Sequence, residues 1–174
     1  KKLDKISEFC TVELANINSN KQMVISGSNS LIDKACEIAK KSGAKKVIRL
    51  PVSAPFHCSM LKTASVELSK KLKNEEINIP KIPVISNVDV EFFKDSEGIK
   101  NGLSRQVMSS VRWYETINRI LKMGISTFVE CGPGKVLSGL VKQISPETKI
   151  LTMRDKNSFE EAVSYLNNSR INDG

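Results

Sequence analysis

The stretch that decides the fold is "CTVELANINSNKQMVISG", residues 10–27, in which two strand-like runs flank the turn-forming letters "NSNK". Short runs of apolar and β-branched residues on either side of such a turn predict a β-hairpin. The flanking sequence extends the pattern, because residues 3–9 resemble the end of a helix and "KKVIRL" at 45–50 resembles a further strand. With one more strand before residue 1, the order becomes β-α-β-β-α-β, which is that of a ferredoxin-like unit.

A helix is expected over residues 28–44, between this hairpin and the strand at 45–50. Its apolar residues recur at helical spacing and form one stripe, which consists of Leu31, Ala35, Ile38 and Ala39. Asn29 or Ser30 is the expected N-terminal cap, and Gly43 is the expected stop. Residues 1–50 are therefore predicted to form a small subdomain, and residues 51–174 the remaining part of the fold.

After Pro51 the pattern indicates alternating helices and strands. Met60, Ala64, Leu68 and Leu72 recur every fourth residue and predict an amphipathic helix over 57–73. The other predicted elements are a buried strand at 82–88, a helical region at about 98–123 broken near Ser109 and Ser110, strands at 126–131 and 148–153, and helices at 135–144 and 157–168. Ser158 and Glu161 have the spacing of a capping box for the last helix. This alternation predicts an α/β class with a mostly parallel sheet covered on both faces.

Composition narrows the function classes. The 174 residues suit one domain, 40% of them are hydrophobic, and the formal charge is +8 from 27 basic and 19 acidic residues. The lysines are scattered along helices, which favours a solvated basic surface over a nucleic-acid footprint, although such a surface could steer an acidic partner. The four cysteines lie far apart without metal-ligand spacing, so neither a zinc site nor a disulfide framework is expected. No signal peptide and no apolar run near ~20 residues is present, so we expect a cytoplasmic protein without a membrane span.

His57, in "PVSAPFHCSM" at 51–60, is the only histidine. If a helix begins just after Pro55, the positive field of its N-terminus would keep the imidazole a free base, as a general base requires. The alternative is a half-buried loop histidine without a catalytic role. Cys58 is a poor partner, because neighbouring side chains on a helix point about 100° apart. "CGPGKVLSG" at 131–139 lacks phosphate-loop spacing and favours a tight strand-to-helix turn, and no G-x-S-x-G elbow is present.

Four stretches together resemble successive motifs of the malonyl-CoA:acyl-carrier-protein transacylases. They are "ANINSNKQMVISG" (15–27), "PVSAPFHCSM" (51–60), "LSRQVMSSVRW" (103–113) and "FVECGPGKVLSGL" (128–140), in the order and spacing of that family. The resemblance covers about residues 3–165 and corresponds to the C-terminal part of the family. It implies an α/β-hydrolase-like core, incomplete in this chain, together with a ferredoxin-like small subdomain, with the active site between them.

The resemblance also implies a ping-pong acyl transfer. A serine takes malonyl from coenzyme A and passes it to the phosphopantetheine thiol of acyl carrier protein, with no further cofactor. His57 matches the family's base, and Gln106 matches the residue whose backbone carbonyl holds the imidazole, as the Asp does in a Ser-His-Asp triad. Phe56 resembles the malonyl-selective form of the motif. Four amide residues are candidates for substrate-side or supporting roles, with packing or turn roles as the alternative: Asn16, Asn18, Gln22 and Asn87.

The family's glutamine loop, its G-H-S-x-G nucleophile and its carboxylate-binding arginine all precede the region that resembles this chain. We therefore expect the chain to be the C-terminal portion of a transacylase, inactive alone because it lacks a nucleophile. Alternatives are a non-catalytic remnant and an acyltransferase of a polyketide-type pathway. A basic ferredoxin-like nucleic-acid module is a remote alternative, since the strand-like runs at 12–17, 22–27 and 45–50 contain none of the aromatic residues that stack on bases.

Overall fold

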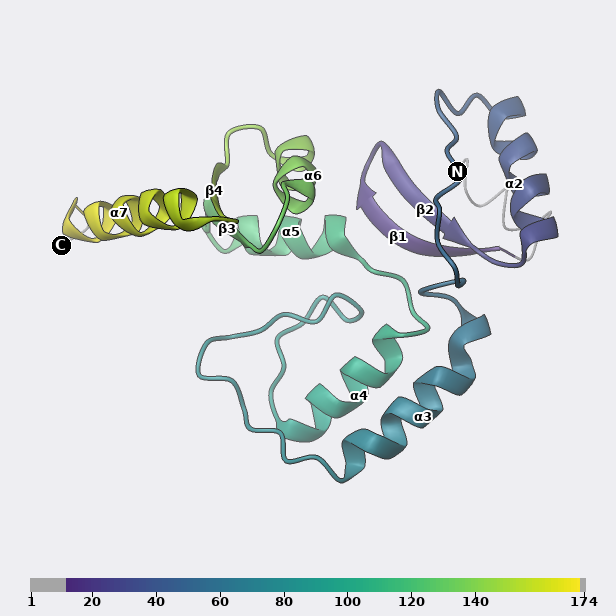
Figure 1. Ribbon diagram of the computed structural model, residues 1–174, viewed down its shortest axis with the longest axis horizontal. Helices are drawn as coiled ribbons and strands as arrows, with labels where there is room; N and C mark the ends of the chain where they lie inside the picture. Colours follow the sequence, from purple (N-terminus) through teal and green to yellow (C-terminus); the bar gives the residue numbers. More distant parts are fainter. Residues whose placement is uncertain (1–11, 173–174) are drawn as a thin grey trace. The chain divides into compact units, whose positions relative to one another are not determined.

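The computed structural model of the chain describes residues 12–172 and has a mixed α/β fold (Figure 1). The described part contains two separate two-stranded sheets. The chain divides into two compact units, of which the first ends at Thr116 and the second begins at Ile117. The predicted helix at 3–9 lies outside the described residues. None of the described helices is both long and apolar enough to span a bilayer.

The first unit begins with the predicted hairpin. Strands β1 (Glu13–Ser19) and β2 (Gln22–Ser26) pair antiparallel, with Ser19 opposite Gln22 across a two-residue turn. Helix α2 (Asn29–Lys41) packs on this hairpin through the predicted apolar stripe, which forms a cluster with Val12 and Ile25. The hairpin, the helix and its stripe are confirmed. The N-cap is Ser28, one residue before the earlier of the two predicted caps.

Gly43 ends α2 as the sequence predicts. It takes a left-handed backbone with φ of 82°, which costs glycine little because it has no Cβ. Its N–H donates to the Lys40 carbonyl at 3.0 Å, and the Ala44 N–H donates to the Ala39 carbonyl at 2.9 Å. These two bonds satisfy the last helix carbonyls in the arrangement of a Schellman motif.

The strand predicted at 45–50 is wrong. The segment is irregular, and no described residue pairs with it as a neighbouring strand. Arg49 instead donates to Asp33 and, at 2.8 Å, to Asn29 of α2. Ile48 and Leu50 keep 62% and 48% of their surface exposed. Local apolar sequence can favour an extended backbone, but a strand forms only where a second backbone pairs with it.

The strand predicted at 82–88 is also wrong, apart from an isolated bridge between Ile85 and Phe92. Residues 87–89 form a turn, because the Ser86 hydroxyl accepts the backbone N–H groups of Val88 and Asp89, both at 3.2 Å. Serine side chains compete in this way with sheet hydrogen bonding. Asn87 therefore lies in a turn and not on a strand.

Helices α3 (Lys62–Lys73) and α4 (Ser96–Gln106) pack against each other in the first unit (Figure 1). A short 3-10 turn, η1 (Ser59–Leu61), precedes α3, so the helix begins later than the predicted residue 57. The buried face of α3 differs from the predicted stripe, because Ala64 is exposed while Ser65 is buried. Met60 lies before the helix, in η1, and is 55% exposed. Ser65 can occupy this inner face because its hydroxyl donates to the Ser104 carbonyl of α4 at 2.6 Å.

Helix α5 (Trp113–Lys122) begins in the first unit and continues into the second, and the predicted break near Ser109 and Ser110 is confirmed. The second unit contains β3 (Thr127–Cys131), α6 (Val136–Ile144), β4 (Lys149–Met153) and α7 (Lys156–Asn172). Strands β3 and β4 pair in parallel, which confirms the predicted strand-helix-strand order.

The capping box of α7 lies three residues before the predicted one. The Asp155 carboxylate accepts the Ser158 N–H at 2.9 Å, and the Ser158 hydroxyl accepts the Asp155 N–H at 3.1 Å. This reciprocal pair makes Asp155 the cap and places Ser158 inside the helix. Glu161 therefore lies one turn too far along to close a box.

Candidate active site

The His57 imidazole is fixed by a main-chain carbonyl. Its Nδ1 lies 2.9 Å from the carbonyl oxygen of Gln106, and the side chain is half-buried. A carbonyl oxygen can only accept, so Nδ1 must carry the proton and donate it to this bond. In the neutral ring the lone pair is then on Nε2, which is the nitrogen left to accept a proton from a substrate or nucleophile.

Gln106 is the last residue of α4, where four backbone carbonyls lack partners within the helix. His57 satisfies the Gln106 carbonyl, and Ser65 satisfies that of Ser104. The expectation that His57 lies at a helix N-terminus is wrong, because α3 begins only at Lys62. The ring contacts a helix C-terminus instead, through the carbonyl of Gln106.

The backbone of His57 is also unusual, with φ of 59°. A residue with a Cβ seldom takes this left-handed conformation, and it persists where neighbouring contacts hold it. Ser59 provides such contacts, because its N–H lies 3.0 and 3.1 Å from the two carboxylate oxygens of Glu13 and its hydroxyl donates to the same group. Cys58 is buried and its thiol donates to the Pro55 carbonyl at 3.1 Å, so its role is packing and not partnership with His57.

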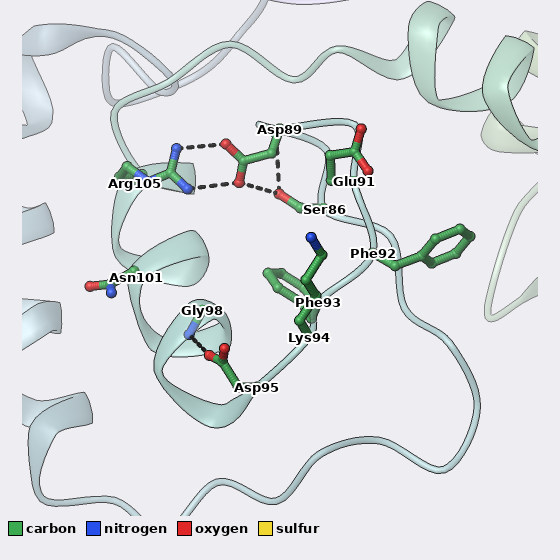
Figure 2. Close-up of a pocket in the computed structure, with 10 residues that line it drawn as sticks. All are labelled: Ser86, Asp89, Glu91, Phe92, Phe93, Lys94, Asp95, Gly98, Asn101 and Arg105. Atoms are coloured by element: carbon green, nitrogen blue, oxygen red, sulfur yellow. Dashed lines mark hydrogen bonds and ion pairs between the residues drawn. The ribbon is translucent and has the colours of Figure 1, made fainter.

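A hollow of about 360 Å³ lies beside α4 and the loop before it (Figure 2). The Arg105 guanidinium donates two hydrogen bonds to the Asp89 carboxylate, both at 2.7 Å, and Ser86 donates to the same carboxylate at 3.2 Å. The Arg105 hydrogen bond is the main cause that lowers the pKa of Asp89. Since the Arg105 cation is already paired, we interpret this ion pair as a structural contact that fixes Arg105, the residue next to Gln106.

The structure describes the four predicted amide residues but joins none of them to the histidine. Asn16 lies on β1 in register with Val111, Asn18 is half-buried on β1, and Gln22 is exposed at the start of β2. The Asn87 carbonyl accepts the Arg112 N–H at 2.9 Å, while its side-chain oxygen is buried without a partner within residues 12–172. No hydrogen bond within that range connects these amides to His57 or Gln106.

Three residues support the site but were not predicted from the sequence: Glu13, Ser59 and Ser65. Ser65 left a signal, because it lies four residues after Leu61 and three before Leu68, inside an apolar helical spacing. A polar residue at such a position requires a buried partner. Glu13 left no comparable signal, because its partner Ser59 is 46 residues away in sequence.

A histidine whose Nδ1 is held by a fixed acceptor is the arrangement of a general base in acyl-transfer enzymes. No protein-family model matches the chain. Among individual proteins, the chain is 41% identical over 170 residues to malonyl CoA-acyl carrier protein transacylase of Bacillus subtilis, covering 97% of this chain and 54% of that protein. The relative from Haemophilus influenzae is 38% identical over 155 residues, covering 89% of this chain and 50% of that protein.

Solved structures agree with these relatives. The acyl-carrier-protein S-malonyltransferase from Burkholderia pseudomallei matches with a TM-score of 0.88 and 43% identity, over 94% of this chain and 53% of that one. A type II PKS acyl-carrier protein in complex with its malonyl-transacylase matches with a TM-score of 0.89 and 34% identity, over 94% and 53% of the respective chains. The chain is therefore homologous to the malonyl CoA-acyl carrier protein transacylases, as its motifs indicate, and spans about half the length of the curated relatives it matches.

Proposed function

We propose that this chain supplies the general base of a malonyl-CoA:acyl-carrier-protein transacylase that acts in fatty acid biosynthesis. The observation that carries the proposal is the hydrogen bond between His57 Nδ1 and the Gln106 carbonyl. It leaves Nε2 as the proton acceptor and provides the orienting role that Asp has in a Ser-His-Asp triad. The chain contains no G-x-S-x-G sequence, so the nucleophilic serine comes from outside these residues.

In the first half-reaction, Nε2 of His57 takes the proton of that serine as the serine oxygen attacks the malonyl thioester. The thioester bond breaks, and the imidazolium returns its proton to the coenzyme A thiolate as it leaves. In the second, the imidazole takes the proton of the phosphopantetheine thiol, whose sulfur attacks the serine ester and releases the serine with the proton from His57. The Gln106 carbonyl accepts from Nδ1 throughout and stabilises each imidazolium.

The family architecture supports a finer description of the fold. We propose that residues 12–50 are part of a ferredoxin-like subdomain, in which β1, β2 and α2 supply a hairpin and its covering helix. Residues 51–172 would belong to an α/β-hydrolase-like core. This proposed boundary at residue 50 differs from the division into two compact units, which falls after Thr116. It stays a prediction.

The substrates and partners proposed are malonyl-CoA and acyl carrier protein, which appear in the names of the relatives, in a cytoplasmic setting. The net charge of +8 suits an acidic carrier. Asn16, Asn18, Gln22 and Asn87 remain candidates for substrate-side or supporting roles, and the Asn87 amide oxygen is buried without a hydrogen-bond partner within residues 12–172. No further cofactor is proposed. The polyketide-type alternative is supported by the similarity to a transacylase bound to a type II PKS carrier.

The base can be tested in a chimera in which this chain replaces the matched segment of the Bacillus subtilis transacylase. We expect His57→Ala to lower kcat/KM for malonyl transfer to acyl carrier protein by about 100-fold or more, the contribution of a general base. Met60→Ala, an exposed substitution three residues away, is the matched control and should leave transfer unchanged. Transfer by His57→Ala within about tenfold of the parent chimera would sink the assignment. A folded parent chimera without transferase activity would also count against it.

A further inference from the structure

We propose that Glu13 is a positioning residue that holds His57 in its left-handed backbone conformation and its ring on the Gln106 carbonyl. Glu13 is the first residue of β1, and its carboxylate accepts the N–H and the hydroxyl of Ser59, two residues after His57. The effect expected on catalysis rests on the proposed function. The effect on the ring does not.

The conformation of His57 requires an external restraint. A positive φ brings the Cβ of an L-residue close to the backbone, so an unrestrained loop would leave this region. The residues beside His57 are restrained on the following side, where Ser59 is bound to Glu13 and Cys58 is buried. The ring itself has one described hydrogen bond, to Gln106. Loss of the hydrogen bonds between Ser59 and Glu13 therefore removes a restraint on the backbone that orients the His57 ring toward the Gln106 carbonyl.

Strand β1 also fixes the segment that follows Gln106. The Ile17 N–H donates to the Val111 carbonyl at 2.9 Å, and the Val111 N–H donates to the Ala15 carbonyl at 2.8 Å. One strand thus binds the chain after the histidine through Glu13 and the chain after the carbonyl through its backbone. Because both segments are bound to the same strand, β1 sets the position of the imidazole relative to the Gln106 carbonyl.

A carboxylate suits this task because Ser59 begins η1, where backbone N–H groups lack partners within the turn. Its two oxygens accept the N–H and the hydroxyl together. Glutamine at position 13 would retain one acceptor oxygen, and alanine would retain none. Glu13→Ala should therefore disturb the position of His57 more than Glu13→Gln does.

The test uses the tautomer of the ring. His57 is the only histidine, so the ¹⁵N spectrum of the histidine-labelled chain contains one imidazole. We expect the native chain to carry its proton on Nδ1. Glu13→Ala should move the signals toward the tautomer mixture measured for the same chain in urea, and Glu13→Gln should fall between. Glu67→Ala removes an exposed carboxylate paired with Lys70 on α3 and is the matched control, with no expected change.

A native tautomer in both folded Glu13 variants overturns the proposal. If circular dichroism shows that Glu13→Ala is unfolded, Glu13→Gln alone decides: a native tautomer in it refutes the proposal and a shifted one supports it. In the chimera, Glu13→Gln should lower kcat about tenfold, as slight misplacement of a catalytic group does, with KM for malonyl-CoA unchanged. An unchanged kcat with a shifted tautomer would refute the catalytic consequence. Full activity of His57→Ala would refute the proposed function and leave the tautomer result standing.

Discussion

Replacing Ser65 with alanine removes the hydroxyl that satisfies the Ser104 carbonyl at the end of α4. Ser65 and Ser104 are only 8% and 7% exposed, so water cannot readily replace the lost donor. Leaving a buried acceptor unpaired costs about 1–3 kcal/mol, whereas Ser→Ala inside a helix gains about 0.5 kcal/mol in helix propensity. We expect a net loss of about 0.5–2.5 kcal/mol in the free energy of unfolding.

Urea unfolding measures this loss, with fluorescence of Trp113, the only tryptophan, as the signal from the first unit. Ser69→Ala is the matched control, because Ser69 lies on the same helix and has no side-chain hydrogen bond within the described residues. The control should keep the propensity gain and lose nothing, and the denaturant slope m should stay the same in all three proteins. Equal free energies for the two variants, to within about 0.5 kcal/mol, would refute the capping role of Ser65.

Two further predictions concern carboxylates whose pKa values are lowered by hydrogen bonds. Asp89→Asn should cost about 0.2–1 kcal/mol at pH 7, the range for partly exposed ion pairs. Arg105 holds the folded-state pKa of Asp89 below its ordinary 3.8. The stabilisation that ionised Asp89 provides is therefore complete above pH 3.8 and is lost as the pH falls through the folded-state pKa. Urea unfolding of both proteins at several pH values measures this loss. A difference in unfolding free energy between the native chain and Asp89→Asn that persists at low pH would contradict the role of the ion pair. In the second unit, Glu130 accepts the Leu137 and Ser138 N–H groups at 3.1 and 2.8 Å near the start of α6, and the Ser138 hydroxyl is the main cause that lowers its pKa. Glu130→Ala should cost about 0.5–2 kcal/mol, as loss of a helix cap does. Hydrogen exchange should show faster exchange of the α6 amides in this variant. Unchanged protection of those amides would contradict the role of Glu130 as a cap.

Elements that depend on neighbouring residues were predictable from the sequence. The hairpin follows from two apolar runs around a short turn, and α2 follows from its stripe and from Gly43, whose positive φ suits glycine. The parallel pair β3 and β4 follows from strand and helix patterns close together in the chain. The motif resemblance also led to His57 and Gln106, and the structure contains the hydrogen bond between them. Whether they catalyse acyl transfer stays a proposal.

Features that depend on distant partners were decided only in three dimensions. The sequence by itself determined which segments favour helix or extended backbone and which histidine could act as a base. It could not determine whether 45–50 finds a strand to pair with, which face of α3 is buried, or that Glu13 binds Ser59. The physical reason is that a hydrogen bond or a buried face requires a second group at the correct distance, and that group comes from another part of the chain. His57 is the clearest case, because its identity as an imidazole is local while its proton position is set by a carbonyl 49 residues away.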